Sequence, residues 1–296
     1  MISPSAIIYR FWTELRRRVL AARYSGGRYI TCNDVTLYCN YRLPTSVWYR
    51  QSIRTGRQEH FATDQRLFDY LLPQTNGNVF VDIGAHFGWY TAFMASHSAV
   101  RGRHQPTILS LEADSPSYAC LSKTADKHTD IRMIALHAAL HHTTENIPAY
   151  LPAADGKGTC LHTYADTAGG QDSIAIKGLA LDDICEKWLE PDDKIAFIKI
   201  DIDGAEPNLF AGGERSLEKH SPFIHMEFWP RGLREFGISP DDYLADLLER
   251  FEVSLCLSSE PFLRKLESCR SLYDSEEWTK KSEQICDLLL VSRAAT

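Results

Sequence analysis

The sequence predicts an α/β protein with a doubly wound sheet, an architecture in which strands and helices alternate along the chain. Three observations predict it. Apolar runs of strand length alternate with amphipathic stretches from about residue 64 onwards. One of these runs, 79–82, ends in an acid and leads into a glycine turn, and a second, 195–201, contains Lys199 and Asp201 and is followed by Gly204. We place strands at 79–82, 107–112, 131–136, 195–201, 223–228, 253–257 and 286–292.

Residues 1–62 are predicted to form an N-terminal extension of an amphipathic helix plus short strands, and residues 63–296 the main domain. The first 24 residues place apolar side chains at helical spacing with arginines between them (Ile7, Ile8, Phe11, Trp12, Leu15, Val19 and Leu20; Arg10, Arg16, Arg17, Arg18 and Arg23). Such a helix docks on its own domain or on a partner subunit, or makes weak contact with an anionic membrane surface. Weak alternation over 28–62 predicts a short hairpin.

The helices of the main domain have recognisable ends. A helix over 64–72 would begin after Thr63 as N-cap and end at Pro73. Ser115-Pro116 and Ser239-Pro240 each predict an N-cap followed by proline at the first helical position. The segment 141–178 is rich in glycine and proline, and we expect a long irregular insert that borders an acceptor pocket.

Composition narrows the class of function. The 296-residue chain carries a net charge of −7, which argues against nucleic-acid binding and is compatible with a small-molecule or carbohydrate acceptor. Its eight cysteines form no C-x-x-C pair, so we expect free thiols in a reducing, cytoplasmic compartment. No run approaches the roughly 20 apolar residues of a membrane-spanning helix. Oligomeric state is not indicated.

The turn after the first strand indicates a cofactor site. Gly84 allows the backbone to come close to a ligand, and the following helix presents free N–H groups. Gly84 and Gly88 are separated by three residues, which does not match the G-x-G-x-x-G spacing of dinucleotide sites. Asp82 at the strand tip disfavours a pyrophosphate and favours a cationic or zwitterionic ligand such as S-adenosylmethionine (SAM). A purely structural turn is the alternative.

Glu112 ends the second strand, 30 residues after Asp82. In doubly wound cofactor-binding folds an acid at this place accepts hydrogen bonds from ribose hydroxyls. The alternative is a solvated acid at a strand end. Given the glycine turn before it, we favour the ribose role.

Charged residues in the later strands form a second candidate site. Lys199 and Asp201 share a face of their strand because side chains alternate with a period of two. A buried ammonium needs a partner, and the next strand supplies His225 and Glu227. If the two strands are neighbours, these side chains converge at the carboxyl edge of the sheet. A structural ion-pair network and a divalent cation site are the alternatives, but compact metal-ligand spacing is missing and we predict no metal.

These motifs, in this order, resemble the FkbM family of SAM-dependent methyltransferases. The family pattern D-[IV]-G-A-N-x-G-x-[YF]-[ST] is matched by 82–91, and K-[IV]-D-[VI]-E-G-x-E by 199–206. Further agreements are Leu181-Asp182-Asp183, Phe210-Ala211-Gly212, Pro222 to Glu227 and the closing 288–291. The resemblance covers about 60–292. The chain departs from the pattern in having His86 for asparagine, Asp203 for glutamate and Glu112-Ala113 for glutamate-proline.

The resemblance implies a Rossmann-like class I methyltransferase fold, with strand order 3-2-1-4-5-7-6 and an antiparallel last strand. It implies O-methylation of a sugar, glycolipid or secondary metabolite, with SAM as cofactor. The residues expected to bind SAM are Asp82, Gly84, Ala85, His86, Gly88, Tyr90, Glu112 and Ala139. The catalytic candidates are Lys199, Asp201, His225 and Glu227, with Trp229 and Arg231 as acceptor contacts. A non-catalytic SAM-binding or scaffold protein is the alternative, and a nicotinamide oxidoreductase is disfavoured by the glycine spacing.

Overall fold

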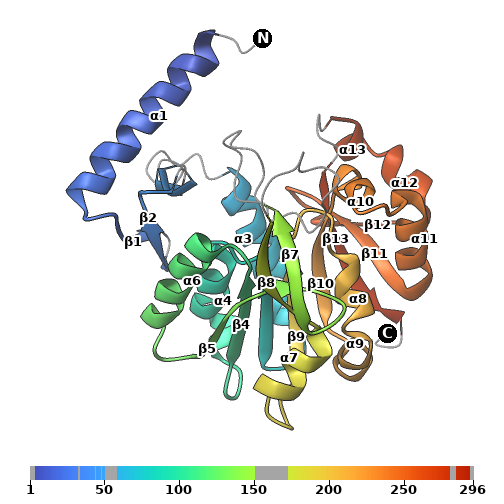
Figure 1. Cartoon of the computed structure of the whole chain (residues 1–296). Coiled ribbons are helices and arrows are strands. Elements are labelled where there is room, and N and C mark those ends of the chain that lie inside the picture. The colour runs from blue at the N-terminus through green and yellow to red at the C-terminus, as the bar shows by residue number, and fades with distance from the viewer. Residues whose placement is uncertain are drawn as a thin grey trace.

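The computed structural model describes residues 4–32, 34–43, 45–47, 49–50, 59–150, 173–280 and 285–293. A central sheet runs through the molecule with helices on both faces (Figure 1). Its strands are β3 (Val79–Ile83), β4 (Thr107–Glu112), β5 (Arg132–His137), β9 (Ile195–Ile200), β10 (Phe223–Phe228), β11 (Phe251–Cys256), β12 (Leu263–Lys265) and β13 (Cys286–Ser292).

The strand order is β12-β11-β13-β10-β9-β3-β4-β5. Strands β5, β4, β3, β9 and β10 run parallel to one another, and β13 runs antiparallel between β10 and β11. The predicted order 3-2-1-4-5-7-6 and the antiparallel last strand are therefore confirmed. The prediction of seven strands was one short, because residues 263–265 return beside β11 and pair Ser254 with Lys265. Three residues are too few to show an alternating pattern.

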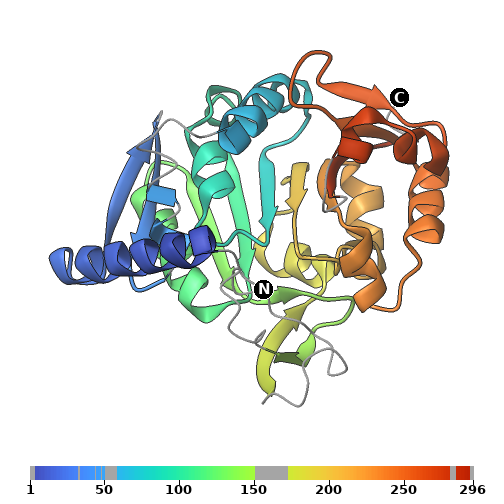
Figure 2. The ribbon, with the colours of Figure 1, turned by 90° about the horizontal axis from the view of Figure 1, so that it is seen from above.

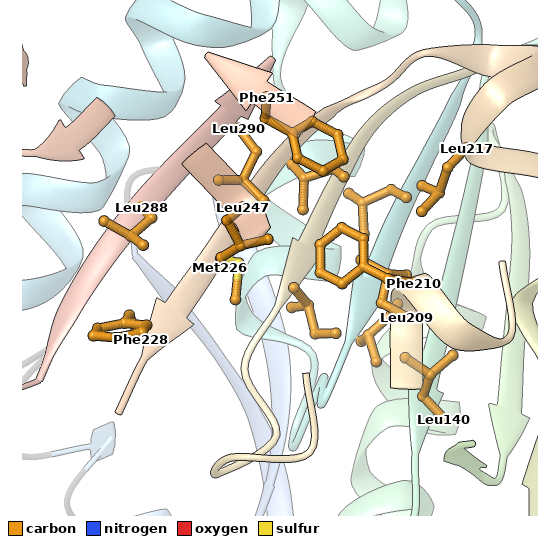
Figure 3. Packing of buried hydrophobic residues seen from close by; sticks show 14 of the residues in the cluster. Leu140, Leu209, Phe210, Leu217, Met226, Phe228, Leu247, Phe251, Leu288 and Leu290 are labelled. Atoms are coloured by element: carbon orange, nitrogen blue, oxygen red, sulfur yellow. The ribbon is translucent and has the colours of Figure 1, made fainter. Parts of the chain in front are cut away.

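Each face of the sheet is covered by a separate apolar core. Val79, Val81 and Ile83 of β3 belong to one core, whereas Phe80 belongs to the other, because successive side chains point to opposite faces. The first core is covered by α7 (Leu181–Trp188), α8 (Pro207–Ala211), α9 (Glu214–His220), α10 (Pro230–Glu235), α11 (Pro240–Arg250), α12 (Cys269–Tyr273) and α13 (Glu276–Lys280). Figure 3 shows side chains of β10 and β13 gathered there with Leu247 of α11.

The opposite face is covered by α3 (Glu59–Leu71), η1 (Leu72–Gln74), α4 (Trp89–Ser96), α5 (Ser98–Arg101) and α6 (Ser115–Lys127). Two predicted helix starts were wrong. Helix α3 begins at Glu59, so Thr63 lies within it rather than at its N-cap. The N-cap of α6 is Asp114, whose carboxylate accepts the Ser117 N–H at 2.9 Å. Ser239 caps α11 as predicted, with its hydroxyl oxygen accepting from Asp242 N at 3.3 Å.

The N-terminal region packs on the second core. Helix α1 (Pro4–Arg23) is followed by the predicted hairpin, β1 (Gly27–Cys32) and β2 (Val35–Asn40), and β2 lies against α4 and α6. The C-terminal half of α1 meets the hairpin region, where Arg17 donates to the Arg42 carbonyl at 2.6 Å, and the N-terminal half of the helix backbone extends away from it (Figures 1 and 2). None of the described helices is long and apolar enough to cross a membrane. Contact with a membrane surface stays a prediction.

The segment 141–178 is more regular than predicted. A small sheet in the order β6-β8-β7 is formed by β6 (Ala139–Leu140), β7 (Glu145–Tyr150) and β8 (Ser173–Leu179). Strands β7 and β8 pair antiparallel across residues 151–172, which lie outside the described residues. The pairing was not predicted because it joins residues that are far apart in the chain. The expectation that this segment borders a pocket is met by Ile176 of β8.

Candidate functional site

A pocket of about 320 Å³ opens at the carboxyl ends of β3, β4 and β9. This is the edge at which doubly wound folds bind ligands. The polar and aromatic side chains that line it include those of Tyr49, His86, Trp89, Tyr90, Glu112, Lys199, Asp201, Asp203 and Phe236. Gly84, Ala85, Ala139 and Ile176 line it as well.

The turn at Gly84 has no side chain, and this lets β3 and the residues after β9 lie close together at the pocket. Gly84 has a φ of +77°, and a Cβ atom there would overlap the carbonyl oxygen of Asp201. The N–H groups of Gly84 and Ala85 both donate to the carbonyl of Leu111, at 3.1 and 2.9 Å. These bonds join the turn after β3 to β4. A side chain at position 84 would separate β3 from the residues after β9, which explains the glycine.

Two of the predicted cofactor residues lie behind the pocket wall rather than in it. Asp82 is fully buried, and its Oδ2 accepts the Thr91 hydroxyl at 2.6 Å. Gly88 is the N-cap of α4 with a φ of +86°, and a Cβ atom there would press on Leu121 and Thr124 of α6. Both residues therefore shape the turn from beneath. The remaining predicted residues, Gly84, Ala85, His86, Tyr90, Glu112 and Ala139, line the pocket.

Glu112 is fixed by the backbone around it. Its Oε2 accepts the His86 N–H and its Oε1 accepts the Asp114 N–H, both at 2.7 Å. Burial raises the pKa of Glu112 to about 7, although both hydrogen bonds act in the opposite direction. Since each carboxylate oxygen has a further lone pair, Glu112 retains the capacity to accept hydrogen bonds from a ligand.

Lys199 supplies the positive charge of the site. Strand register places it beside Asp82 of β3, and its Nζ lies 3.1 Å from Asp201 Oδ2. The same nitrogen lies 4.6 Å from the centre of the Tyr90 ring. Burial opposes the charged form of Lys199, but Asp201 and Asp82 outweigh it, so its pKa is raised. Burial raises the pKa of Asp82, and Lys199 opposes that shift. One ammonium and two carboxyl groups are therefore connected here, with Lys199 and Asp201 in the pocket lining and Asp82 behind it.

His225 and Glu227 are on the neighbouring strand, as predicted, but neither lines the pocket. The His225 ring packs edge-on against Phe68 of α3, with ring centres 5.3 Å apart, and it is only 3% exposed. Neither of its ring nitrogens has a hydrogen-bond partner in the described part of the chain. Burial, followed by the negative charge of Asp201, raises the pKa of Glu227. The structure thus brings Lys199 and Asp201 to the pocket and leaves the other two outside its lining.

The turn after β9 repeats the architecture of the first. Asp203 has a φ of +56°, and the backbone of Gly204 lies so close to Gly232 that a Cβ atom would overlap it. Glu206 is 1% exposed, and its Oε1 accepts the Ile202 N–H at 3.0 Å. Burial raises the pKa of Glu206 to about 8. The carboxyl group of Glu206 therefore holds the turn that presents Asp201 and Asp203 to the pocket.

Tyr49 and Phe236 are among the pocket residues that the sequence reasoning missed. Tyr49 comes from the N-terminal extension, 33 residues before Asp82, and Phe236 is the C-cap of α10. No local pattern distinguishes either from an ordinary core aromatic. The predicted acceptor residues Trp229 and Arg231 do not line the pocket; Trp229 is the N-cap of α10, and Arg231 pairs with Glu235 at 3.1 Å. Among the residues that the structure describes, no group of three or more histidine, cysteine or acidic side chains could hold a metal ion.

Comparison with known proteins places this site in a family. The family described as "Methyltransferase FkbM domain" matches residues 82–251, which include both glycine turns. No curated protein matches the sequence.

Solved structures with a similar arrangement include three methyltransferases. Methyltransferase FkbM from Methylobacillus flagellatus KT is 16% identical with a TM-score of 0.41, and the alignment covers 72% of this chain and 43% of that one. The chain thus spans less than half the length of that protein. An O-methyltransferase from Bacillus cereus in complex with SAH is 13% identical, with 79% and 80% covered and a TM-score of 0.38. TomG from Streptomyces achromogenes, an O-methyltransferase in complex with SAM, is 9% identical, with 77% and 79% covered and a TM-score of 0.40.

Proposed function

The chain belongs to the FkbM methyltransferase family, and on that premise we propose that it is a SAM-dependent O-methyltransferase. The acceptor that we propose is a hydroxyl group of a sugar, glycolipid or secondary metabolite. The observation that carries the proposal is the composition of the pocket, in which a partly exposed carboxylate, Asp201, is held by a buried ammonium, Lys199, at the edge where the glycine turn opens.

The residues of the pocket fit SAM in size and chemistry. A volume of about 320 Å³ is within the range of small-molecule sites. Gly84 and Ala85 leave backbone close to the pocket, and Glu112 would hold the ribose hydroxyls with its remaining lone pairs. The carboxylate of Asp203, which also lines the pocket, suits the positive charges of the ligand. Ala139 and Leu140 add an apolar wall, as a purine ring requires.

Bound SAM supplies a methyl group that is already activated on a sulfonium. The protein therefore has to align the acceptor and remove the hydroxyl proton. We assign removal of the hydroxyl proton to Asp201, because it lines the pocket and its side chain is 44% exposed. Lys199 fixes the position of that carboxylate through its 3.1 Å contact with Oδ2. We rank His225 and Glu227 below Asp201, since neither lines the pocket.

Two measurements on the full chain test this function. The first is calorimetric titration with SAM and with S-adenosylhomocysteine (SAH), in protein shown to be folded and free of cofactor. The second is incubation with methyl-labelled SAM and a panel of hydroxyl acceptors, each paired with its own methyl ether as an unreactive control. The proposal is supported if label appears in a hydroxyl acceptor and not in its methyl ether. SAM binding without turnover on any acceptor would favour the non-catalytic alternative, and no binding at all would contradict SAM dependence.

A further inference from the structure

The N-terminal extension contributes directly to the pocket through Tyr49, and this inference rests on the function proposed above. We propose that Tyr49 is a positioning residue: its hydroxyl sets the tautomer of His86, so that His86 Nε2–H donates a hydrogen bond to the carboxylate at the amino-acid end of SAM. Tyr49 lies outside the region 82–251 that matches the family.

The first observation is the packing of the two rings. Tyr49 is 8% exposed, and its hydroxyl oxygen lies 3.3 Å from His86 Nδ1. The Tyr49 ring is stacked near both His86 and Phe87, with centre separations of 5.8 and 5.5 Å. His86 is itself stacked on Phe87, with ring centres 4.1 Å apart and planes 4° apart. The Tyr49 and Phe87 rings therefore hold the imidazole in one orientation.

The backbone conformation at position 86 is one that histidine can adopt. His86 has a φ of +52°, in the left-handed region where asparagine, aspartate and histidine are several-fold enriched. The family pattern has asparagine at this position, so the replacement by histidine keeps the turn. The backbone N–H of His86 also donates to Glu112, which ties the turn at position 86 to the expected ribose end of the pocket.

The protonation states of Tyr49 and His86 bear on which ring nitrogen of His86 carries the hydrogen. Burial lowers the pKa of His86 to about 4, which makes the ring neutral at pH 7; Asp114 and Asp201 act against this shift and Lys199 adds to it. Burial raises the pKa of Tyr49, so its phenol keeps its proton. In the proposed arrangement the protonated phenol donates to Nδ1 across 3.3 Å, and the ring hydrogen is then on Nε2.

The remaining polar atom of His86 is therefore a donor in a pocket that is rich in acceptors. No described residue forms a hydrogen bond with Nε2, and His86 lines the pocket with Glu112, Asp201 and Asp203. The cation of the pocket, Lys199, is already paired with Asp201. A ligand carboxylate would be repelled by the three acids, and His86 Nε2–H is a donor in the pocket lining that can receive it.

The test is a double-mutant cycle read by ligand affinity. SAH carries the amino-acid end, whereas 5′-methylthioadenosine has the same nucleoside without it. We expect Tyr49→Phe to weaken SAH binding about 3- to 10-fold and to leave methylthioadenosine binding unchanged, because one hydrogen bond to a charged group is at stake. In a His86→Asn background, Tyr49→Phe should have no further effect on SAH, because the asparagine amide needs no tautomer to be set. Tyr70→Phe, at an exposed position, is the matched control.

A second readout reports the tautomer itself. In protein labelled with ¹⁵N-histidine, the His86 signals should indicate hydrogen on Nε2 in the wild type and a mixture of tautomers in Tyr49→Phe. Equal weakening of SAH and methylthioadenosine, or additive effects of the two substitutions, would overturn the proposal and leave Tyr49 as a packing residue. The proposal would also be overturned if the wild type binds SAH and the Tyr49→Phe variant binds it with the same affinity. Failure of the wild type to bind either ligand would instead contradict the proposed function.

Discussion

The ammonium of Lys199 lies 3.1 Å from Asp201 Oδ2, yet the two side chains differ in exposure, at 4% and 44%. Lys199 lines the pocket with its side chain almost entirely buried beside Asp82, whereas the Asp201 side chain is partly exposed. Removal of the Lys199 ammonium therefore leaves the buried carboxyl group of Asp82 without its opposite charge. Removal of the partly exposed Asp201 carboxylate changes the chemistry of the pocket and leaves the core nearly unchanged. The first two predictions follow from this asymmetry.

Asp201→Asn should reduce turnover far more than cofactor affinity. Loss of a general base typically reduces the rate about 10²- to 10⁴-fold, and the amide keeps the size of the side chain. We expect kcat to decrease by at least about 100-fold while the Kd for SAH changes only a few-fold. Asp246→Asn, on the exposed side of α11, is the control. Equal losses in kcat and in SAH affinity would place Asp201 in the cofactor site instead.

Lys199→Met should destabilise the fold by about 3–5 kcal/mol, the usual cost of removing one partner from a buried charge pair. The fully buried Asp82 would then have no neighbouring cation. Urea unfolding measures the change, and Lys219→Met at an exposed position should stay within about 0.5 kcal/mol of the wild type. Adding Asp82→Asn to Lys199→Met should recover part of the loss. If the single and double variants were equally unstable, the charge argument would be wrong.

Glu206 should make stability depend on pH. Burial raises its pKa from 4.5 to about 8 in the folded state, so the folded chain binds this proton more tightly than the unfolded chain. The resulting stabilisation is complete below about pH 4.5 and is lost as pH rises to about 8, with a slope of up to roughly 1.4 kcal/mol per pH unit.

Glu206→Gln removes that titration and retains the oxygen that accepts the Ile202 N–H. Unfolding free energies of both proteins at intervals from pH 4.5 to 8.5 provide the measurement. We expect the variant to gain stability relative to the wild type as pH increases, because other titrating groups, including Glu112, are common to both and cancel. Parallel curves for the two proteins would show that Glu206 does not titrate in this window.

SAM should raise the melting temperature by mass action on the folded state. At a concentration about 100-fold above its Kd, a ligand adds about 2.7 kcal/mol of stability. Gly84→Ala is the informative comparison, because a Cβ atom there would overlap the Asp201 carbonyl and close the turn. We expect a clear shift for the wild type in a thermal melt and none for Gly84→Ala in protein that is still folded. A wild type unaffected by millimolar SAM would count heavily against a SAM site.

Much of the fold was readable from local pattern. The strands at 79–83, 107–112 and 223–228 are fully or largely buried runs, and their apolar composition is what a strand covered on both faces requires. The helix caps were less predictable. Asp114 and Ser115 are both good N-cap residues, and only the tertiary position of the chain after β4 decides between them.

The sequence by itself determined the elements whose physical cause is local. These are the buried strands, the turn at Gly84, where the positive φ of +77° favours glycine, and the placing of Lys199 and Asp201 on one face by the period of a strand. Tertiary structure decided what depends on contacts between distant residues. It buried His225 against Phe68, which lies 157 positions earlier in the chain, and it brought Tyr49 into contact with His86. The energy of such a contact depends on how two separate elements pack, and neither stretch of sequence contains that information alone.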